Sequence, residues 1–208
     1  MAIDQTTGQT SLRSRKYADA RRSLFEAAMA LFLAKGFDET SVEEIVERAG
    51  FSRATFFNHF GTKSAVLRYY GEALQERVRQ MLKALDSSVE PVARLKQVFF
   101  AMAKDAQAHR EELKLVFAHS IHDEAYLARP TPARQRTLVM LAQLISEGQA
   151  QGEIRRDLSA DEQARQLLGL YNNALLMIIF GGRNAKAAIE PMWSFAIGGI
   201  GGRHTLAE

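Results

Sequence analysis

The chain has 208 residues and no cysteine. This absence excludes disulfides, thiolate metal sites and cysteine nucleophiles, and it is consistent with a reducing cytoplasm. No apolar run reaches the ~20 residues that a membrane span needs. The N-terminal residues are polar and have no apolar centre of the kind found in signal peptides. We therefore expect a cytoplasmic protein that does not enter a membrane.

Proline is scarce and the net charge is small. The chain has four prolines, which we expect to separate helical segments: Pro91, Pro130, Pro132 and Pro191. No segment shows a clear strand-type alternation of apolar and polar residues. A formal charge of +3 is too small for a broadly basic protein, so any contact with nucleic acid must rely on a local basic face. These features predict an all-α globular protein.

Catalytic and cofactor motifs are also missing. No phosphate-binding loop and no dinucleotide fingerprint occurs. Residues 50–54 approach a serine-hydrolase motif without its second glycine or its preceding strand, so we interpret Ser52 as a helix cap. His119 and His122 have the spacing of two metal ligands on one helix face, but no third strong ligand accompanies them. They remain candidates for a pocket rim or for ordinary surface and core residues, and we expect no enzyme activity, cofactor or metal.

The most informative segment is residues 41–63, which contains two short helical patterns joined by a glycine turn. Ser41 is a good N-cap, and Glu44 three residues later completes a capping box. Gly50 supplies the left-handed residue that ends the first helix. Two short helices with a tight turn between them form a helix-turn-helix, which places its second helix in the DNA major groove.

The second helix of this motif divides into two faces. Ser52 caps its start, and Phe56 and Phe60, one turn apart, are expected to face inward. The open side then carries Arg53, Thr55 and Asn58. Asn58 can read an adenine edge with two hydrogen bonds.

Charged residues around the motif allow more than one interpretation. Lys63 lies at a helix start, where a cation opposes the helix dipole, so either a DNA phosphate lies nearby or the ammonium is simply solvated. The acidic residues Glu43, Glu44 and Glu47 are expected to point away from the DNA backbone. The basic residues between 13 and 22 either touch phosphate or the minor groove, or belong to a solvated tail.

The segment from residue 21 to residue 70 resembles the DNA-binding domain of the tetracycline-repressor (TetR) family. The matching motifs are AAMALF at 27–32, GF at 36–37, TSVEEI at 40–45, AGFS at 49–52 and TFFNHF at 55–60, followed by Lys63. Two residues depart from the family, which commonly has tyrosine at Phe57 and often another aromatic at Asn58. Because a phosphate-binding hydroxyl is missing and a base-reading amide is present, the operator preference of a relative cannot be transferred.

Together, the motif and the resemblance imply a domain organisation and a set of DNA contacts. We interpret residues 1–18 as a disordered basic arm, 19–66 as the DNA-binding domain, and 67–208 as a helical domain for ligand binding and dimerisation. The expected helices span residues 20–35, 41–49, 52–60, 63–85, 91 onward, 112–122, 133–151, 159–180 and 185–197. The expected DNA contacts are Thr40, Ser41, Ser52, Arg53, Thr55, Phe57, Asn58, His59 and Lys63.

The C-terminal part carries soft apolar residues that either pack a core or line a pocket. As a ligand pocket we predict Phe99, Met102, Phe117, His119, His122, Tyr171 and Asn172. Residues 167–180 are apolar nearly all round, which indicates a helix buried on two sides. The resemblance implies that the last two helices form a four-helix bundle with a second subunit. As dimer contacts we predict Leu168, Leu175, Ile178 and Trp193.

These interpretations predict a homodimeric transcriptional regulator that binds a palindromic operator in double-stranded DNA. The favoured reading is a repressor. The resemblance implies that a small-molecule effector releases the operator by tilting the long helix at 63–85. Two alternatives remain: a regulator or DNA-organising factor that needs no ligand, and a helical enzyme or carrier with an incidental helix-turn-helix.

Overall fold

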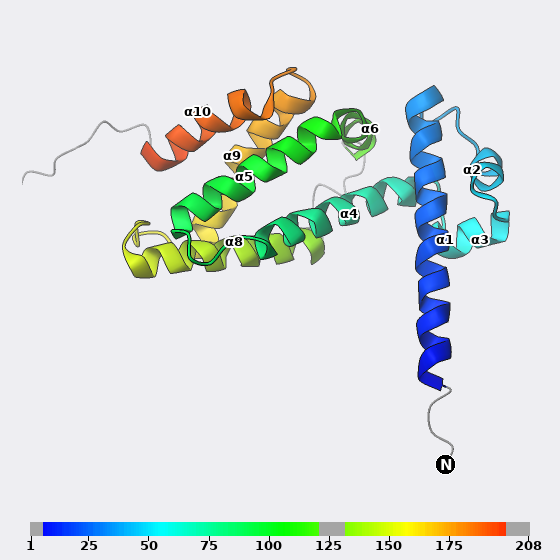
Figure 1. The fold of residues 1–208 in the computed structure, drawn as a ribbon. Helices are drawn as coiled ribbons and strands as arrows, with labels where there is room; N and C mark the ends of the chain where they lie inside the picture. Colours follow the sequence, from blue (N-terminus) through cyan, green and yellow to red (C-terminus); the bar gives the residue numbers. More distant parts are fainter. Residues whose placement is uncertain (1–5, 121–131, 199–208) are drawn as a thin grey trace, which may run out of the picture. The chain divides into compact units, whose positions relative to one another are not determined.

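The computed structural model describes residues 6–120 and 132–198, and every regular element in these ranges is an α-helix (Figure 1). The prediction of an all-α fold is therefore confirmed. The chain divides into two compact units, Met1–Gly71 and Glu72–Glu208, which we call unit 1 and unit 2.

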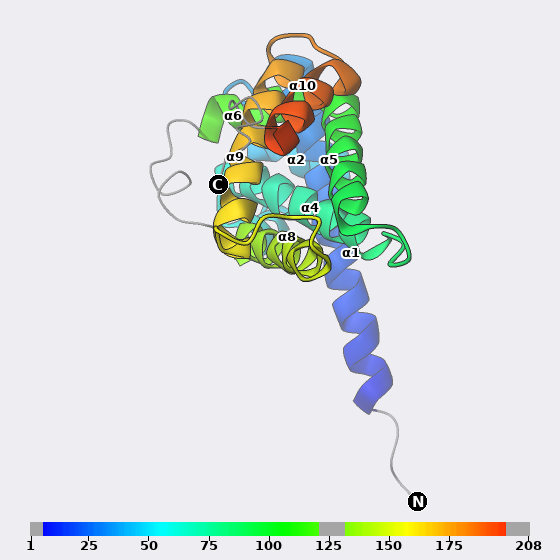
Figure 2. The same ribbon diagram turned by 90° about the vertical axis from the view of Figure 1, so that its left-hand side faces the viewer.

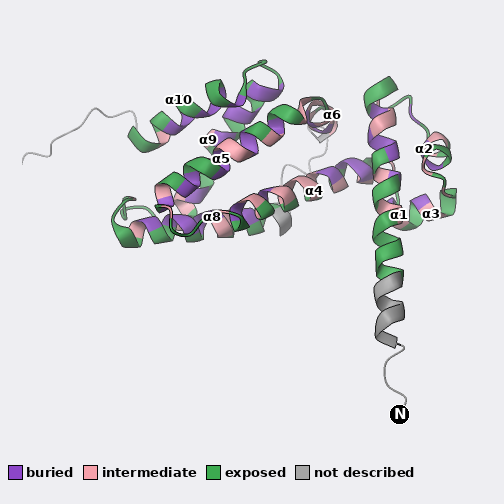
Figure 3. Ribbon diagram, in the orientation of Figure 1, coloured by how far each residue is buried: buried purple, intermediate pink, exposed green. Residues whose placement is uncertain are grey.

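Unit 1 contains three helices and the start of a fourth. They are α1 (Thr6–Lys35), α2 (Val42–Ala49), α3 (Arg53–Phe60) and the first turns of α4 (Ser64–Lys83). The core of unit 1 is built around fully buried side chains from these helices: Leu24, Ala28, Phe32, Ile45, Phe56 and Val66. In Figure 3 the buried positions of α1 lie in its C-terminal half, which packs against α2 and α3.

The start of α1 differs from the sequence prediction. A disordered arm was expected over residues 1–18, whereas α1 begins at Thr6, and residues 1–5 lie outside the described part of the chain. Residues 6–18 contain no proline and a single glycine, so little in this stretch would end a helix. The basic side chains at 13, 15 and 16 are exposed on this extension, and so is Arg22 just beyond it.

The boundary between the units also differs from the predicted one at residues 66 and 67. It lies at Gly71 because the first turns of α4 belong to the core of unit 1. Val66, Leu67 and Tyr70 are all buried there, and the ring centroid of Tyr70 lies 6.3 Å from that of Phe25 on α1.

Unit 2 consists of the rest of α4 and five further described helices. These are α5 (Pro91–Ala108), α6 (Arg110–Ser120), α8 (Pro132–Gln151), α9 (Ala160–Ile179) and α10 (Ala185–Gly198). Helix α9 packs against α5, α8 and α10, as Figure 2 shows. Pro91 begins α5 as expected. Pro132 begins α8 instead of preceding it, and Pro191 lies inside α10 rather than between helices. Pro130 lies outside the described residues. Within the described ranges, no helix is long and apolar enough to cross a membrane.

Candidate DNA-binding face and ligand cavity

The start of α2 is fixed by a complete capping box. The Ser41 hydroxyl accepts a hydrogen bond from the Glu44 amide at 3.2 Å, and the Glu44 carboxylate accepts one from the Ser41 amide at 2.9 Å. Lys35 donates to the other Glu44 oxygen at 2.5 Å. This hydrogen bond, followed by those from Ser41, lowers the pKa of Glu44 to about 2. Ser41, predicted to touch DNA, is therefore already engaged in helix capping.

Helix α3 begins and ends as its sequence predicts. The Ser52 hydroxyl accepts from the Thr55 amide at 3.1 Å and lies 2.9 Å from the Thr55 hydroxyl. Phe56 and Phe60 are buried, which confirms the predicted inner face. Gly50 ends α2 with a φ of 73°, a left-handed conformation that glycine adopts without strain. The turn between α2 and α3 therefore depends on this residue.

The outer face of α3 presents four side chains, from two successive turns, to solvent. Arg53 and Phe57 are one turn apart, and so are Ala54 and Asn58, and all four side chains are exposed. The Phe57 side chain is 43% exposed. An apolar ring can contact a thymine methyl group, and arginine and asparagine can read guanine and adenine. Ala54 was missed by the sequence reasoning because alanine carries no chemical signal.

Glu43 does not point away from this face, contrary to the prediction. Its carboxylate forms an ion pair with the Arg53 guanidinium at 2.6 Å, and both side chains are more than half exposed. Exposed pairs of this kind contribute about 0–1 kcal/mol. The ion pair with Glu43 therefore costs little to break, and the Arg53 guanidinium is free to take another partner.

Two predicted DNA contacts have internal partners instead. Thr40 is 1% exposed and donates to the Gly36 carbonyl at 2.7 Å, so its side chain belongs to the interior of unit 1. The Lys63 ammonium donates to the carbonyls of Phe37, Asp38 and Thr40 at 2.6, 3.3 and 2.8 Å. These carbonyls offset the positive charge of Lys63 at the start of α4, so no phosphate is needed to explain a cation at this end of the helix dipole. We assign Lys63 to holding the loop between α1 and α2 against the start of α4.

His59, another predicted contact, lies partly under α1. The Tyr17 ring packs against it with 4.1 Å between ring centroids, and its Nδ1 atom is buried. Burial, with a smaller effect from the positive charge of Arg21, lowers the pKa of His59 below its ordinary value. A neutral His59 is therefore expected at physiological pH, which makes it a packing residue rather than a cationic phosphate contact.

Replacing Lys63 by alanine is expected to lower the free energy of unfolding by about 1.5–3 kcal/mol, the usual range for hydrogen bonds from a charged group. The slope of log affinity for DNA against log salt should stay unchanged, because no phosphate contact is lost. Thermal melts and salt titrations measure the two effects. Arg68→Ala, which removes an exposed cation of α4, is the control for charge. A shallower salt slope with unchanged stability in the Lys63 variant would restore the phosphate assignment.

Unit 2 contains a cavity of about 300 Å³ bounded by α4, α5, α6, α8 and α9. Four predicted pocket residues line it: Met102, Phe117, Tyr171 and Asn172. Phe99 does not, because its buried ring packs between Tyr171 and Trp193. His119 also lies outside the lining, with Nδ1 2.9 Å from the Leu115 carbonyl. His122 falls outside the described residues.

The polar groups of the cavity were largely missed by the sequence reasoning. Asp105 accepts a hydrogen bond from Arg77 Nε at 3.2 Å and faces His109 Nδ1 at 3.4 Å. The Thr137 hydroxyl donates to the Gln75 side-chain oxygen at 2.6 Å. The lining includes Gln75, Asp105, Arg134 and Thr137, which come from three helices. No sequence spacing brings these helices together.

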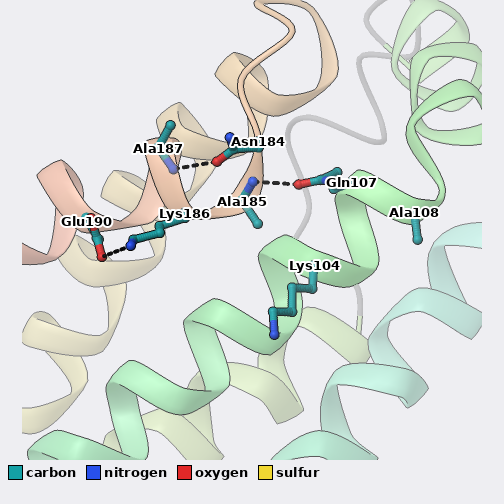
Figure 4. Close-up of a pocket in the computed structure, with 8 residues that line it drawn as sticks. All are labelled: Lys104, Gln107, Ala108, Asn184, Ala185, Lys186, Ala187 and Glu190. Atoms are coloured by element: carbon teal, nitrogen blue, oxygen red, sulfur yellow. Dashed lines mark hydrogen bonds and ion pairs between the residues drawn. The ribbon is translucent and has the colours of Figure 1, made fainter.

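A second hollow of about 740 Å³ lies between the end of α5 and the start of α10 (Figure 4). The amide of Ala185 donates to the Gln107 side chain at 2.6 Å, and that of Ala187 donates to the Asn184 side chain at 2.8 Å. These two amides at the start of α10 are therefore already satisfied. In the described residues, no group of three or more His, Asp or Glu side chains could hold a metal ion.

The predicted dimer contacts are buried inside unit 2. Leu168, Leu175 and Trp193 are 8% exposed and Ile178 is fully buried, so each packs in the core of its own subunit rather than on an exposed face. An all-round apolar helix does not show from its sequence which of its faces the core takes. A different set of large apolar side chains on α9 and α10 is exposed: Leu176, Met177, Phe180, Phe195 and Ile197. Met177 and Phe195 also line a hollow of about 230 Å³ that is formed by residues of α9 and α10.

Family models match both parts of the chain. The model of bacterial regulatory proteins of the tetR family matches residues 24–70. That of the tetracyclin repressor-like C-terminal domain matches residues 91–172. These matches cover the helix-turn-helix and most of unit 2.

Three individual proteins are similar to this chain over most of its length. The repressor DhaR of Mycobacterium sp. strain GP1 is 30% identical over 164 residues, which cover 75% of this chain and 80% of DhaR. The structure of FadR from Thermus thermophilus, a TetR-family repressor in complex with lauroyl-CoA, has 30% identity and a TM-score of 0.63, over 90% of this chain and 98% of that one. Salmonella enterica GusR shares the fold at 22% identity, with a TM-score of 0.66 over 86% of this chain and 94% of that one.

The chain belongs to the TetR family. It is a helix-turn-helix transcriptional repressor that binds DNA, and its family is not enzymatic.

Proposed function

We propose that the protein binds a palindromic operator as a homodimer in the cytoplasm and leaves it when a small molecule occupies the cavity of unit 2. The observation that carries this proposal is the course of α4. Its first turns belong to the core of unit 1, and its later residues Leu74, Gln75 and Val78 line the cavity. One helix is thus part of both the DNA-binding unit and the wall of the cavity.

The DNA side of the proposal rests on the exposed face of α3. A recognition helix reads base edges through side chains near its N-terminus, where Arg53 and Ala54 lie, and Phe57 and Asn58 follow one turn later. The exposed basic residues at 13, 15 and 16 on α1 add positive charge to unit 1, which suits the phosphate backbone. A single short helix reads only a few base pairs, so two copies on two half-sites are needed for specificity.

The ligand side rests on the form of the cavity and on a relative. A volume of about 300 Å³ with mostly apolar walls and a few polar groups is typical of sites for small molecules. FadR, the similar repressor described above, was solved with lauroyl-CoA. An occupant can shift the protein only through different affinities for its DNA-bound and free conformations. Movement of α4 would supply that difference, because recognition helices must lie about 34–36 Å apart on DNA.

Selection of genomic fragments followed by binding assays tests the proposal. We expect a fragment with two inverted half-sites to bind at least ~1,000-fold more tightly than scrambled DNA, as specific regulators do. A compound library is then screened by thermal shift, because a ligand that binds the folded state raises the melting temperature. Compounds that stabilise the protein should weaken operator binding. Stabilising compounds that leave operator affinity unchanged would instead support a ligand-independent regulator.

A further inference from the structure

The cavity of unit 2 contains a buried donor that the protein itself does not use. Tyr171 is 5% exposed and lines the cavity. Its ring packs against Phe99, with 5.5 Å between centroids, and in the described part of the chain its hydroxyl has no hydrogen-bond partner. Burial, followed by the negative charge of Asp105, raises the pKa of this phenol above its ordinary value. The hydroxyl therefore stays protonated at neutral pH.

The Tyr171 hydroxyl oxygen is not completely enclosed by the protein, so it is accessible from the cavity. Most polar atoms in protein interiors have a partner. A ligand that fills the cavity must therefore accept a hydrogen bond from this hydroxyl or leave it unsatisfied. Other walls of the cavity, among them Met102, Leu113 and Phe117, are apolar, so the rest of such a ligand must be apolar as well.

The charge beside Tyr171 limits the kind of acceptor. Asp105 lines the same cavity, and its side chain is 12% exposed. A ligand carboxylate at Tyr171 would face this carboxylate in a poorly hydrated space, where like charges repel strongly. A ligand hydroxyl avoids the repulsion, because it can accept from one group and donate to another. A ligand ammonium would be attracted to Asp105 but has no acceptor for Tyr171.

The basic side chains near the cavity do not reverse this preference. Arg77 and His109 are directed to Asp105, with the Arg77 Nε bond at 3.2 Å and the His109 contact at 3.4 Å. Arg134 also lines the cavity, but it is exposed. A ligand anion there would be paired in water, where such pairs contribute little.

We infer that the cavity binds an uncharged, mainly apolar molecule whose single hydroxyl accepts a hydrogen bond from Tyr171 and donates one to Asp105. The volume of about 300 Å³ equals that of about ten water molecules at about 30 Å³ each. Alcohols and phenols with roughly ten to twelve non-hydrogen atoms therefore have the right size. This inference rests on the proposed function, in which the cavity is the effector site, and it specifies the chemistry of that effector.

Matched probes test the inference with the full-length protein. Affinities are measured by calorimetry for decanol, decanoate, decylamine and decane, for naphthol, naphthoate and naphthalene, and for lauroyl-CoA. We expect each alcohol or phenol to bind about 2- to 12-fold more tightly than the corresponding acid, amine or hydrocarbon, which is the range that one net hydrogen bond contributes. Tighter binding of the acids or of lauroyl-CoA, or no binding of any probe, would overturn the inference.

The variant Tyr171→Phe removes only the phenolic oxygen and keeps the ring against Phe99. It should bind decanol about 2- to 12-fold more weakly and decane with unchanged affinity, so the selectivity for the alcohol should fall by the same factor. Phe117→Leu, which alters an apolar wall, is the matched control and should weaken all probes together. Melting curves establish that both variants fold. If Tyr171→Phe keeps the wild-type selectivity, the hydroxyl does not bind the ligand.

Operator binding, measured in parallel, separates this inference from the proposed function. Selective binding of the alcohols without any change in operator affinity would leave the cavity chemistry intact and refute ligand-controlled release. Release of the operator by the acids alone would refute the inference and leave the proposed function intact. Asp105→Asn provides a second check, because removing the charge should reduce the discrimination against decanoate.

Discussion

Replacing Phe195 by lysine is expected to convert the proposed dimer to monomers and to lower operator affinity by at least ~100-fold. Phe195 on α10 is 43% exposed and Met177 on α9 is 39% exposed, and both border the same hollow. A charge at this position would have to be buried without a partner in a dimer. Two linked half-sites bind about 10²–10⁴-fold more tightly than one, and a monomer loses this gain.

Sedimentation velocity and operator titration at micromolar concentration measure these effects. Val139→Lys is the matched control, because Val139 is an exposed apolar residue of α8, 46% exposed, outside the α9 and α10 surface. It should leave both the dimer and the affinity unchanged. A wild-type monomer at this concentration would refute the dimer, and a dimeric Phe195→Lys variant would place the interface elsewhere.

The helix-turn-helix could be predicted from the sequence because its signals are local. Capping boxes, glycine turns and helical apolar spacing act over three or four residues. Ser41 with Glu44, Ser52 with Thr55 and the φ of Gly50 all appear in the structure as the sequence predicts. The inward direction of Phe56 and Phe60 follows from the same short-range geometry.

Errors occurred where a residue's role depends on distant parts of the chain. The carbonyls bound by Lys63 belong to residues 23–26 positions earlier, and Glu43 meets Arg53 across the turn. At the sequence level a cation at a helix start looks the same whether its partner is a phosphate or a backbone carbonyl. The basic stretch before residue 20 likewise gave no sign of whether it continues α1.

The C-terminal unit was the least predictable for the same reason. Its cavity joins side chains from five helices, and helix periodicity identifies an apolar face without naming its neighbour. Leu168 and Leu175 thus line the cavity although they were expected at a dimer interface. Asp105 and Thr137 carry polar functions in the cavity that no motif marks. The apolar stripe of α9 was recognised, but its division between an inner and an outer face required the structure.

Replacing Arg53 by alanine is expected to lower operator affinity by about 2–6 kcal/mol in the dimer, because each subunit loses one two-bond base contact of about 1–3 kcal/mol. The loss on scrambled DNA should be much smaller, since nonspecific binding depends mainly on phosphate contacts. Titrations of the operator and of a scrambled duplex at several salt concentrations measure both. Preference at one position of each half-site should relax, which variant operators with single base changes would show.

Glu43→Gln is the matched variant that tests what the ion pair with Glu43 contributes to DNA binding by Arg53. It removes the carboxylate 2.6 Å from the guanidinium and leaves Arg53 in place. Because an exposed ion pair contributes at most about 1 kcal/mol, operator affinity should stay the same or rise by a few-fold as Arg53 loses a competing partner. If Glu43→Gln weakens the operator as much as Arg53→Ala, the ion pair positions Arg53 for reading DNA. Equal losses on operator and scrambled DNA in Arg53→Ala would make Arg53 a backbone contact, and base reading would then fall to Asn58.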